Sequence, residues 1–415
     1  MLNREALLMM MSVGGGQKIK QVACTINSTW FINSKGELYG CGSSYSGQQG
    51  NGSKDNVLAF TKRADNVDKV SCSGSVVWYI TKSGELYGCG SNWGNQGNGS
   101  TSDVNVFTKR ADNVAYFSCS DRTTWYVTKA GELYGCGNNT YGQQGSGSKD
   151  AVTIFTKRAE NVAQVFCSDF TTWYITKSKE LYGCGYNNYG QQGSGSTSNI
   201  TVFTKRADNI NFFACSNETT WYVTTTGELW GCGNNTFGQQ GSGDSLTGFN
   251  TFTKRADNIS LVTCSDDTTW YVTNDNKLYG CGYNASGQQG ISNTTYVRNF
   301  TKRAENALKA VCSDTLTLYI TKSNDLYYTG YLGGYQYGGN EAPDGISSFT
   351  LIESNIKDTV TAYDHYFSYD TYNEVSMGVT WYLTTSSELF GMGYNDSGQQ
   401  GNNTTSTVLE FTKRP

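Results

Sequence analysis

Apolar and polar positions follow a pattern of about 48 residues that recurs eight times along the chain. In the copy at 114–161, apolar residues fill 114–119 and bulky side chains alternate over 123–128. Two further segments of β-type composition cover 132–137 and 152–159, and turn-forming residues separate all four segments. Each copy therefore predicts four short antiparallel strands.

A four-stranded unit of this size cannot bury both of its faces alone, so the copies must pack against one another. Radial stacking with ring closure achieves this and also protects the strand edges. The sequence therefore predicts an all-β chain that forms a single β-propeller over residues 19–415, preceded by an extension over 1–18. The eight units begin near residues 19, 67, 114, 162, 210, 259, 307 and 356. Eight blades are expected, and seven blades plus a divergent segment is the alternative.

The extension over 1–18 combines an apolar, methionine-rich stretch at 7–11 with three glycines at 14–16. An exposed methionine cluster is a liability, which favours docking of this segment into a partner subunit. A poorly ordered terminus is the alternative. The early acid Glu5 and the lack of a convincing cleavage site argue against a secretory signal peptide.

Tryptophan marks the second predicted strand of seven units, and Leu318 replaces it in the other. The tryptophans are Trp30, Trp78, Trp125, Trp173, Trp221, Trp270 and Trp381. The chain has 49 glycines and 29 tyrosines but only 2 prolines. Glycine, asparagine, serine and aspartate must therefore form most of the turns.

Net charge and hydropathy exclude two classes of partner. The chain carries 31 basic and 35 acidic side chains, a formal net charge of −4. Nucleic-acid binders need a basic domain or stripe, so nucleic acid is not an expected partner. No run of about 20 apolar residues occurs, so insertion into a membrane is not expected.

Thirteen cysteines recur at fixed places in the units, in pairs whose members lie 17 residues apart, with Cys312 left over. A repeated position indicates packing of small buried side chains and not a disulfide framework. By sequence spacing, Val375 and Met392 occupy the corresponding places in the last unit. Because His365 is the single histidine and no C-x-x-C occurs, we expect no metal and no cofactor.

Residues 137–145, Gly-Asn-Asn-Thr-Tyr-Gly-Gln-Gln-Gly, resemble the Gly-x-Asn-x-x-Gly-Gln-Leu-Gly signature of the regulator of chromosome condensation repeat family. The match recurs at Gly185 to Gly193, Gly233 to Gly241, Gly282 to Gly290 and Gly393 to Gly401. The resemblance implies a β-propeller, commonly of seven blades. Cys136, Thr123 and Gln144 depart from the tryptophan, histidine and leucine that are usual in the family.

For the founding member of the family, the resemblance implies guanine-nucleotide exchange on a small GTPase. That activity depends on particular loops that this chain does not visibly reproduce, and a shared fold does not carry a function. The chain also lacks a G-x-S-x-G motif and a nucleotide-binding loop. We therefore expect a protein that is not an enzyme.

Seven units carry a Lys-Arg dipeptide, which is 14 of the 31 basic side chains. The dipeptides are Lys62-Arg63, Lys109-Arg110, Lys157-Arg158, Lys205-Arg206, Lys254-Arg255, Lys302-Arg303 and Lys413-Arg414. In six of them an acidic residue follows two positions after the arginine, so charge compensation within or between blades is expected. A basic circle that binds phosphate or an anionic polymer is the alternative.

Four consecutive units place an aromatic residue before the Gly-Gln-Gln-Gly turn or its variant. These residues, the aromatic rim, are Trp93, Tyr141, Tyr189 and Phe237. Such an arc can stack sugar rings or hold a partner protein. Packing against the neighbouring blade is the alternative, although serine replaces the aromatic residue in three units.

The seventh unit and its junction with the eighth depart most from the repeat, with an irregular insertion around 350–375. Deviant loops on a regular scaffold often carry function. The candidate residues here are Tyr331, Tyr335, Tyr337, Tyr366 and Tyr369. Decay of a repeat at the point of ring closure is the alternative.

These patterns favour a binding or structural propeller whose partner is a protein or an assembly subunit, with a surface glycan as a second ligand class. A surface rich in asparagine, serine, glycine and tyrosine without a signal peptide is typical of a virion protein made in a host cytoplasm. Near-identical repeats indicate recent duplication, as in phage tail, fibre or decoration proteins that attach to a host. A cytoplasmic protein-interaction scaffold is the alternative, and nucleotide exchange ranks below both.

Overall fold

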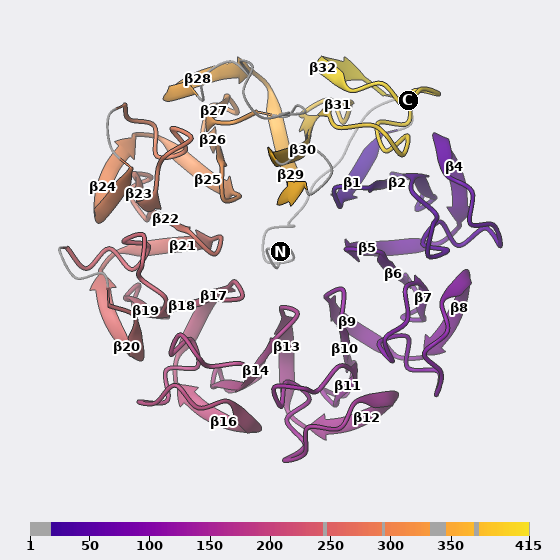
Figure 1. Cartoon of the computed structure of the whole chain (residues 1–415), viewed down its shortest axis with the longest axis horizontal. Coiled ribbons are helices and arrows are strands. Elements are labelled where there is room, and N and C mark those ends of the chain that lie inside the picture. The colour runs from indigo at the N-terminus through magenta and orange to yellow at the C-terminus, as the bar shows by residue number, and fades with distance from the viewer. Residues whose placement is uncertain (1–17, 244–246, 293–294, 333–345, 369–372, 415) are drawn as a thin grey trace.

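The computed structural model describes residues 18–243, 247–292, 295–332, 346–368 and 373–414. The side chains at 363–368 and 373–376 are not described. Eight four-stranded antiparallel sheets stand around one axis as blades (Figure 1). The predicted all-β propeller with eight blades is therefore confirmed, and the seven-blade alternative is wrong. The methionine-rich stretch at 7–11 lies outside the described residues.

Each blade uses four strands that are consecutive in sequence, with the first near the axis and the fourth at the rim (Figure 1). The first strands are β1 (Ile19–Cys24), β5 (Val67–Ser73), β9 (Val114–Cys119), β13 (Val162–Cys167), β17 (Ile210–Cys215), β21 (Ile259–Cys264), β25 (Ala307–Cys312) and β29 (Ile356–Ser368). The second strands are β2 (Ser28–Asn33), β6 (Val76–Thr81), β10 (Thr123–Thr128), β14 (Thr171–Thr176), β18 (Thr219–Thr224), β22 (Thr268–Thr273), β26 (Leu316–Thr321) and β30 (Asn373–Thr384).

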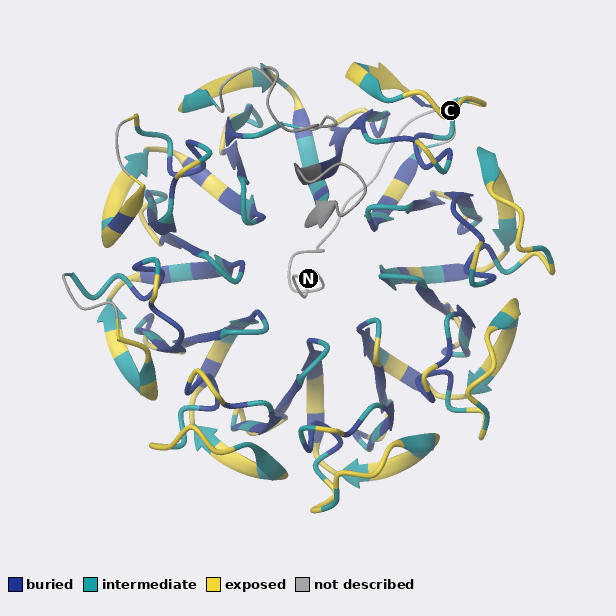
Figure 2. Cartoon of the chain, viewed as in Figure 1, coloured by how far each residue is buried: buried dark blue, intermediate teal, exposed yellow. Residues whose placement is uncertain are grey.

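The outer half of each blade follows the same order. The third strands are β3 (Leu38–Gly42), β7 (Leu86–Gly90), β11 (Leu133–Gly137), β15 (Leu181–Gly185), β19 (Leu229–Gly233), β23 (Leu278–Tyr283), β27 (Leu326–Gly330) and β31 (Leu389–Gly393). The fourth strands are β4 (Val57–Ala64), β8 (Val104–Ala111), β12 (Val152–Ala159), β16 (Ile200–Ala207), β20 (Phe249–Ala256), β24 (Tyr296–Ala304), β28 (Ile346–Glu353) and β32 (Val408–Lys413). Figure 2 shows that burial concentrates in the second and third strands and that the rim strands are largely exposed.

The core lies between blades, and the repeated tryptophan forms its centre. Trp125 is fully buried, and its ring meets Phe203 of the next blade edge-on at a centroid distance of 5.8 Å. Opposite it in the sheet stands Gly135, where a Cβ atom would lie 2.3 Å from the tryptophan ring. Trp381 and Phe60 make the equivalent contact at 5.9 Å, so the first and last blades close the ring through the same packing.

None of the thirteen cysteines forms a disulfide, as expected, and all but Cys72 are buried. The cysteine of the third strand also bonds across the blade interface, where Cys136 Sγ donates to the Asn95 carbonyl oxygen at 3.3 Å. In blade seven Thr329 takes this place, and its hydroxyl donates to the Gly287 carbonyl oxygen at 2.8 Å. The thiols therefore add a weak hydrogen bond to their packing role.

The match of Val375 to the first cysteine of each unit is wrong. Cys119 pairs with Thr124 in the sheet, and the residue that pairs with the corresponding Thr380 is Thr361. The insertion lengthens the hairpin of β29 and β30, so Val375 lies farther along it and pairs with Tyr366. Counting back from the tryptophan therefore leads into the wrong strand.

The ring has two faces. The "loop face" carries the hairpins between first and second strands and the loops between third and fourth strands, and the "turn face" carries the other connections. On the turn face, Lys157 Nζ lies 2.6 Å from Glu132 and 2.6 Å from Glu160. Equivalent ion pairs recur around the ring, which confirms charge compensation for the lysines of the Lys-Arg dipeptides.

Candidate functional site

The loop face carries one of the most variable positions among otherwise similar repeats. The Phe-Thr-Lys-Arg segment of the rim strands hardly changes from blade to blade. By contrast, one residue at the hairpin between first and second strands differs in every regular blade: Asn27, Ser75, Arg122, Phe170, Glu218, Asp267 and Thr315. Positions that vary in a repeated scaffold are not dictated by the fold, so this face is the candidate functional site.

A glutamine latch fixes the loop of this face to the next blade in blades three, four, five, six and eight, and Asn95 makes the same contact in blade two. Gln143 Oε1 accepts a hydrogen bond from the Tyr141 backbone N–H at 3.0 Å, which stabilises its own turn. Gln143 Nε2 donates to the Asp169 carbonyl oxygen in the next hairpin at 3.1 Å. Gln399 repeats this contact across the ring closure, with Nε2 2.8 Å from the Ile26 carbonyl oxygen. The loops are therefore held at defined positions beside the hairpin tips.

An aromatic cluster spans blades three and four on this face. The Tyr141 ring lies 5.3 Å from Phe170 and 4.9 Å from Tyr186, both edge-on. The Arg122 guanidinium lies 5.8 Å from the centre of the Phe170 ring, within range of a cation–π interaction. The cluster joins one rim aromatic to the variable residues of two hairpins.

Blades four and five continue the surface with a half-buried acid, Glu218. Tyr189 is 39% exposed, and its ring lies 6.1 Å from Tyr186. Glu218 accepts a hydrogen bond from Asn234 Nδ2 at 2.6 Å, and burial raises the pKa of this carboxyl. The nearby Glu218 carboxylate raises the pKa of the Tyr189 phenol.

The "blade 3–5 arc" is the continuous surface formed by these side chains. It consists of Arg122, Tyr141, Phe170, Tyr186, Tyr189 and Glu218.

The other two rim aromatics differ from each other. Phe237 packs on the next blade, 5.1 Å from Tyr283 and 5.7 Å from Tyr296. Trp93 is 66% exposed. Packing between blades thus accounts for part of the contacts of Tyr141 and Phe237, whereas Trp93 presents its ring to solvent. Ligand binding by the aromatic rim stays a prediction.

The sequence prediction did not include four members of the arc: Arg122, Phe170, Tyr186 and Glu218. Alignment of the units would have found three of them, because Arg122, Phe170 and Glu218 occupy the hairpin position that varies. Tyr45, 82% exposed beside the serine of the first blade, was also missed. It stands one position before the expected place of the aromatic residue.

The irregular segments contribute less to the described surface. Tyr331 follows β27, and its backbone N–H donates to the Thr315 carbonyl oxygen at 2.8 Å. Tyr366 belongs to β29 by its backbone, which extends the hairpin of blade eight beyond the length of the others. Tyr335, Tyr337 and Tyr369 lie outside the described residues. Binding by these five tyrosines stays a prediction.

Carboxyl groups gather where the hairpins of blades five to seven meet. Burial, with added repulsion from Asp314, Asp266 and Glu218, raises the pKa of Asp267 to about 8. Among the described side chains, no group of three or more His, Cys, Asp or Glu residues is placed to hold a metal ion. The described part of the chain contains no helix long and apolar enough to cross a membrane.

Comparison with known proteins agrees with the geometry. Residues 162–191 match the model of the regulator of chromosome condensation (RCC1) repeat. No curated protein sequence matches the chain.

Three solved structures share the fold. Human WBSCR16 has 19% identity and a TM-score of 0.59, covering 72% of this chain and 86% of its own. Prp20p of Saccharomyces cerevisiae has 16% identity and a TM-score of 0.57, covering 71% and 80%. Yeast RCC1 (Prp20), in its complex with Kap60, has 12% identity and a TM-score of 0.60, covering 98% and 91%. These matches show that the chain shares the β-propeller fold of these structures and that residues 162–191 are similar to a regulator of chromosome condensation repeat.

Proposed function

We propose that the chain is a non-enzymatic propeller that binds a protein partner through its loop face, centred on the blade 3–5 arc. The observation that carries this proposal is the collection of variable hairpin residues beside exposed and clustered aromatic rings on one face of the ring. A purely structural ring would repeat one residue at that position, as it repeats tryptophan in its core.

The chemistry of the arc supports a protein partner. Aromatic rings and arginine are enriched where binding energy concentrates in protein interfaces. Tyr189 is 39% exposed, and Trp93 one blade beyond the arc is 66% exposed. Gln191 and Asn95 fix the loops that carry Tyr189 and Trp93 before binding, which reduces the entropy lost on association.

The relatives also support a protein as the class of partner. Prp20p was described with binding properties to Gsp1p and histones, and yeast RCC1 (Prp20) in a complex with Kap60. These partners belong to those proteins and not to this chain. A surface glycan is the second ligand class for the exposed aromatic rings.

For the biological setting we propose a virion, in which the chain serves as a tail, fibre or decoration component that contacts a partner subunit or the host surface. Near-identical repeats and a surface rich in asparagine, serine and threonine support this setting. A cytoplasmic interaction scaffold is the alternative. Quantitative mass spectrometry of purified particles tests the virion setting, since a virion component is present in the particles at a fixed copy number.

Site-specific photo-crosslinking tests the loop face. A benzophenone amino acid replaces Trp93 or Tyr189 on the loop face, and Lys129 on the turn face is the matched exposed control. The proposal expects one and the same protein crosslinked from both loop-face positions and not from Lys129. Equal crosslinking from all three positions, or none from the loop face, would contradict it.

Nucleotide exchange on a small GTPase remains the competing function, because two of the similar structures are of yeast Prp20. Release of a fluorescent guanine nucleotide from a small GTPase of the source cell measures it. We expect no acceleration by the purified chain, and robust acceleration would replace the proposal.

A further inference from the structure

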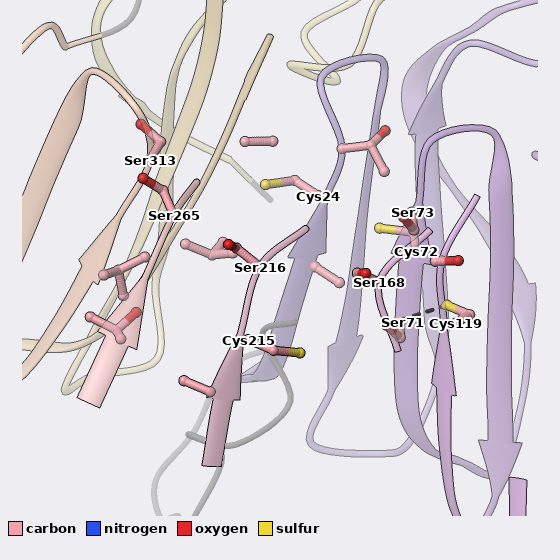
Figure 3. A pocket seen from close by; sticks show the side chains of 18 of the residues that line it. Cys24, Ser71, Cys72, Ser73, Cys119, Ser168, Cys215, Ser216, Ser265 and Ser313 are labelled. Carbon is pink, nitrogen blue, oxygen red and sulfur yellow. Dashed lines mark hydrogen bonds between the residues drawn. The ribbon is translucent and has the colours of Figure 1, made fainter. Parts of the chain in front are cut away.

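A cavity of about 430 Å³ lies on the axis of the ring (Figure 3). The first strand of each blade is the innermost, so the last residues of these strands converge on the axis (Figure 1). The volume falls within the range of about 300–1,000 Å³ that is typical of small-ligand sites. The cavity is separate from the blade 3–5 arc in its lining, because none of the six arc residues lines it.

The walls of the cavity combine hydroxyl groups, thiols and apolar side chains. Figure 3 shows the hydroxyls of Ser168, Ser216, Ser265 and Ser313, contributed by consecutive blades. Thiols from the first five blades stand beside them, and burial raises the pKa of the Cys215 thiol, so it stays neutral. None of these groups supplies a positive charge.

Carboxylates supply the charge of the lining. Asp169, Asp266, Asp314 and Asp358 line the cavity, and no lysine or arginine is among its described lining residues. Asp358 is neutralised by Lys309, whose Nζ lies 2.5 Å away. The other three carboxyl groups belong to blades four, six and seven and make this side of the cavity acidic, although burial raises the pKa of Asp314.

Two buried acceptors of this region lack a hydrogen-bond partner. They are Asn217 Oδ1 and Asp314 Oδ1, on the blades that flank blade six. Asp266 lies between them and uses its Oδ1 to accept the Asn217 backbone N–H at 2.9 Å. Buried polar atoms are nearly always paired, and two unpaired acceptors beside a carboxylate need a donor.

We propose that the axial cavity binds a primary alkylammonium group at the acceptor cluster of Asn217, Asp266 and Asp314. An ammonium group carries three donors and one positive charge, which matches both the orphan acceptors and the acidic lining. Its methylene chain lies along the apolar wall of Phe213, Val262 and Ala310, each of which is buried and lines the cavity. The source of the group is either a free aliphatic polyamine or a lysine side chain of a partner.

The inter-blade role of the hairpin aspartates provides the control. Asp121, Asp169 and Asp266 each accept a backbone N–H from the preceding blade. Asp121 makes this contact with Ser75 at 3.1 Å but does not line the cavity. Asp121→Asn therefore perturbs the same structural contact and leaves the acceptor cluster intact.

Isothermal titration calorimetry of the full-length chain tests the site. Spermidine represents the free polyamine, a Gly-Gly-Lys-Gly-Gly peptide represents the lysine side chain, and heptane-1,7-diol is the uncharged control. We expect saturable binding of at least one ammonium probe and no binding of the diol. Spermidine binding assigns a free amine as the source, and binding of the peptide alone assigns a partner lysine.

The variants decide whether binding occurs at the cluster. Asp314→Asn is expected to weaken binding by about tenfold or more, and Asp121→Asn by less than about twofold. Asp266→Asn replaces Asp314→Asn if near-ultraviolet circular dichroism shows that the latter does not fold. Absence of binding by both ammonium probes, or equal affinity in the wild type and both cluster variants, overturns the proposal. Failure here leaves the loop-face proposal unaffected, because the crosslinking positions do not line the cavity.

Discussion

Leu318 and Tyr328 face each other in blade seven at the register position where each of the other seven blades pairs tryptophan with glycine. In those blades the indole covers the glycine so closely that a Cβ would lie 2.3–2.5 Å from the ring. Blade seven reverses the sizes, with the smaller Leu318 fully buried and Tyr328 in the place of the glycine. Both arrangements fill the same space between neighbouring blades.

This reversal predicts strong coupling between the two positions. Leu318→Trp alone introduces a large ring beside Tyr328 and is expected to destabilise the chain by about 1–3 kcal/mol. Leu318→Trp combined with Tyr328→Gly restores the pair of the other blades and is expected to recover most of that loss. Urea unfolding of the single and double variants measures the coupling. Additive effects would show that the two side chains do not share one space.

The tryptophan period was enough to predict the number and order of the strands, because each strand repeats one local pattern. The contacts between blades could not be predicted from the sequence. Gln143 meets the Asp169 carbonyl oxygen, and Trp125 meets Phe203, only when neighbouring blades pack together. Spacing along the chain does not reveal on which strand inserted residues lie. For this reason the sequence assigned Val375, and not Thr361, to the position of the first cysteine in the last blade.

The candidate site was predicted only in part for a related reason. The aromatic rim could be predicted from the sequence because each of its residues directly precedes the repeated Gly-Gln-Gln-Gly motif or its variant. Phe170 and Glu218 belong to a position defined by its variation, and their proximity to Tyr141 and Tyr189 arises across a blade boundary.

The inter-blade thiol contact predicts different effects for two substitutions of Cys184. Cys184 Sγ donates to the Gln143 carbonyl oxygen at 3.4 Å, and Thr329 makes the corresponding contact in blade seven. Cys184→Thr keeps a donor, whereas Cys184→Val has the same shape without one. Thermal unfolding is expected to rank the threonine variant about 1 kcal/mol more stable than the valine variant. Equal stability of the threonine and valine variants would indicate that Cys184 contributes packing and no significant hydrogen bond.

The contact of Gln399 across the ring closure predicts that its loss speeds local opening of the first and last blades. The same loss between two blades that are joined by the chain should not have this effect. No described strand is exchanged between the termini, so the first and last blades are held by noncovalent contacts, such as Gln399 Nε2 to the Ile26 carbonyl oxygen and the Asn403 N–H to the Leu58 carbonyl oxygen. Gln399→Leu leaves that buried carbonyl unpaired, at a cost of about 1–3 kcal/mol. We expect faster amide hydrogen exchange in β1 and β30.

Gln191→Leu is the matched control for this experiment. Gln191 makes the same contact with the Asn217 carbonyl oxygen, but the chain directly connects its two blades. In the Gln191→Leu variant, amide hydrogen exchange in blades one and eight should stay at the wild-type rate. Equal acceleration by both variants would indicate that closure is no weaker than the other interfaces.

The aromatic rim is expected to divide into residues that support the fold and residues that support binding. Tyr141→Ala removes ring contacts with Phe170 and Tyr186, worth about 0.5–1.5 kcal/mol each, and should lower the unfolding midpoint. Trp93→Ala changes an exposed ring and should alter stability by less than about 0.5 kcal/mol. Titration with the crosslinked partner should nevertheless show weaker binding by Trp93→Ala. Unchanged affinity would remove Trp93 from the proposed interface.

The partly buried carboxyl of Asp267 predicts that stability falls as the solution becomes more alkaline. Its pKa rises from 3.8 to about 8, chiefly through burial, so the folded chain keeps a proton that the unfolded chain releases. This stabilisation is complete below the unfolded pKa and is lost as the pH rises through about 8. The free energy of unfolding should therefore decline between about pH 5 and pH 8.5, and Asp267→Asn should flatten the decline.

Glu37 on the turn face provides a control of opposite sign. The hydrogen bond from Lys62 lowers the pKa of Glu37 from 4.5 to about 2. Its stabilisation is present above the unfolded pKa and is lost only as the pH falls below about 4.5 toward 2. Glu37→Gln should therefore leave the slope between about pH 5 and pH 8.5 unchanged. Urea midpoints across this range separate the two carboxyls, and a wild-type profile that is flat or rises with pH would show that Asp267 is ionised in the folded ring.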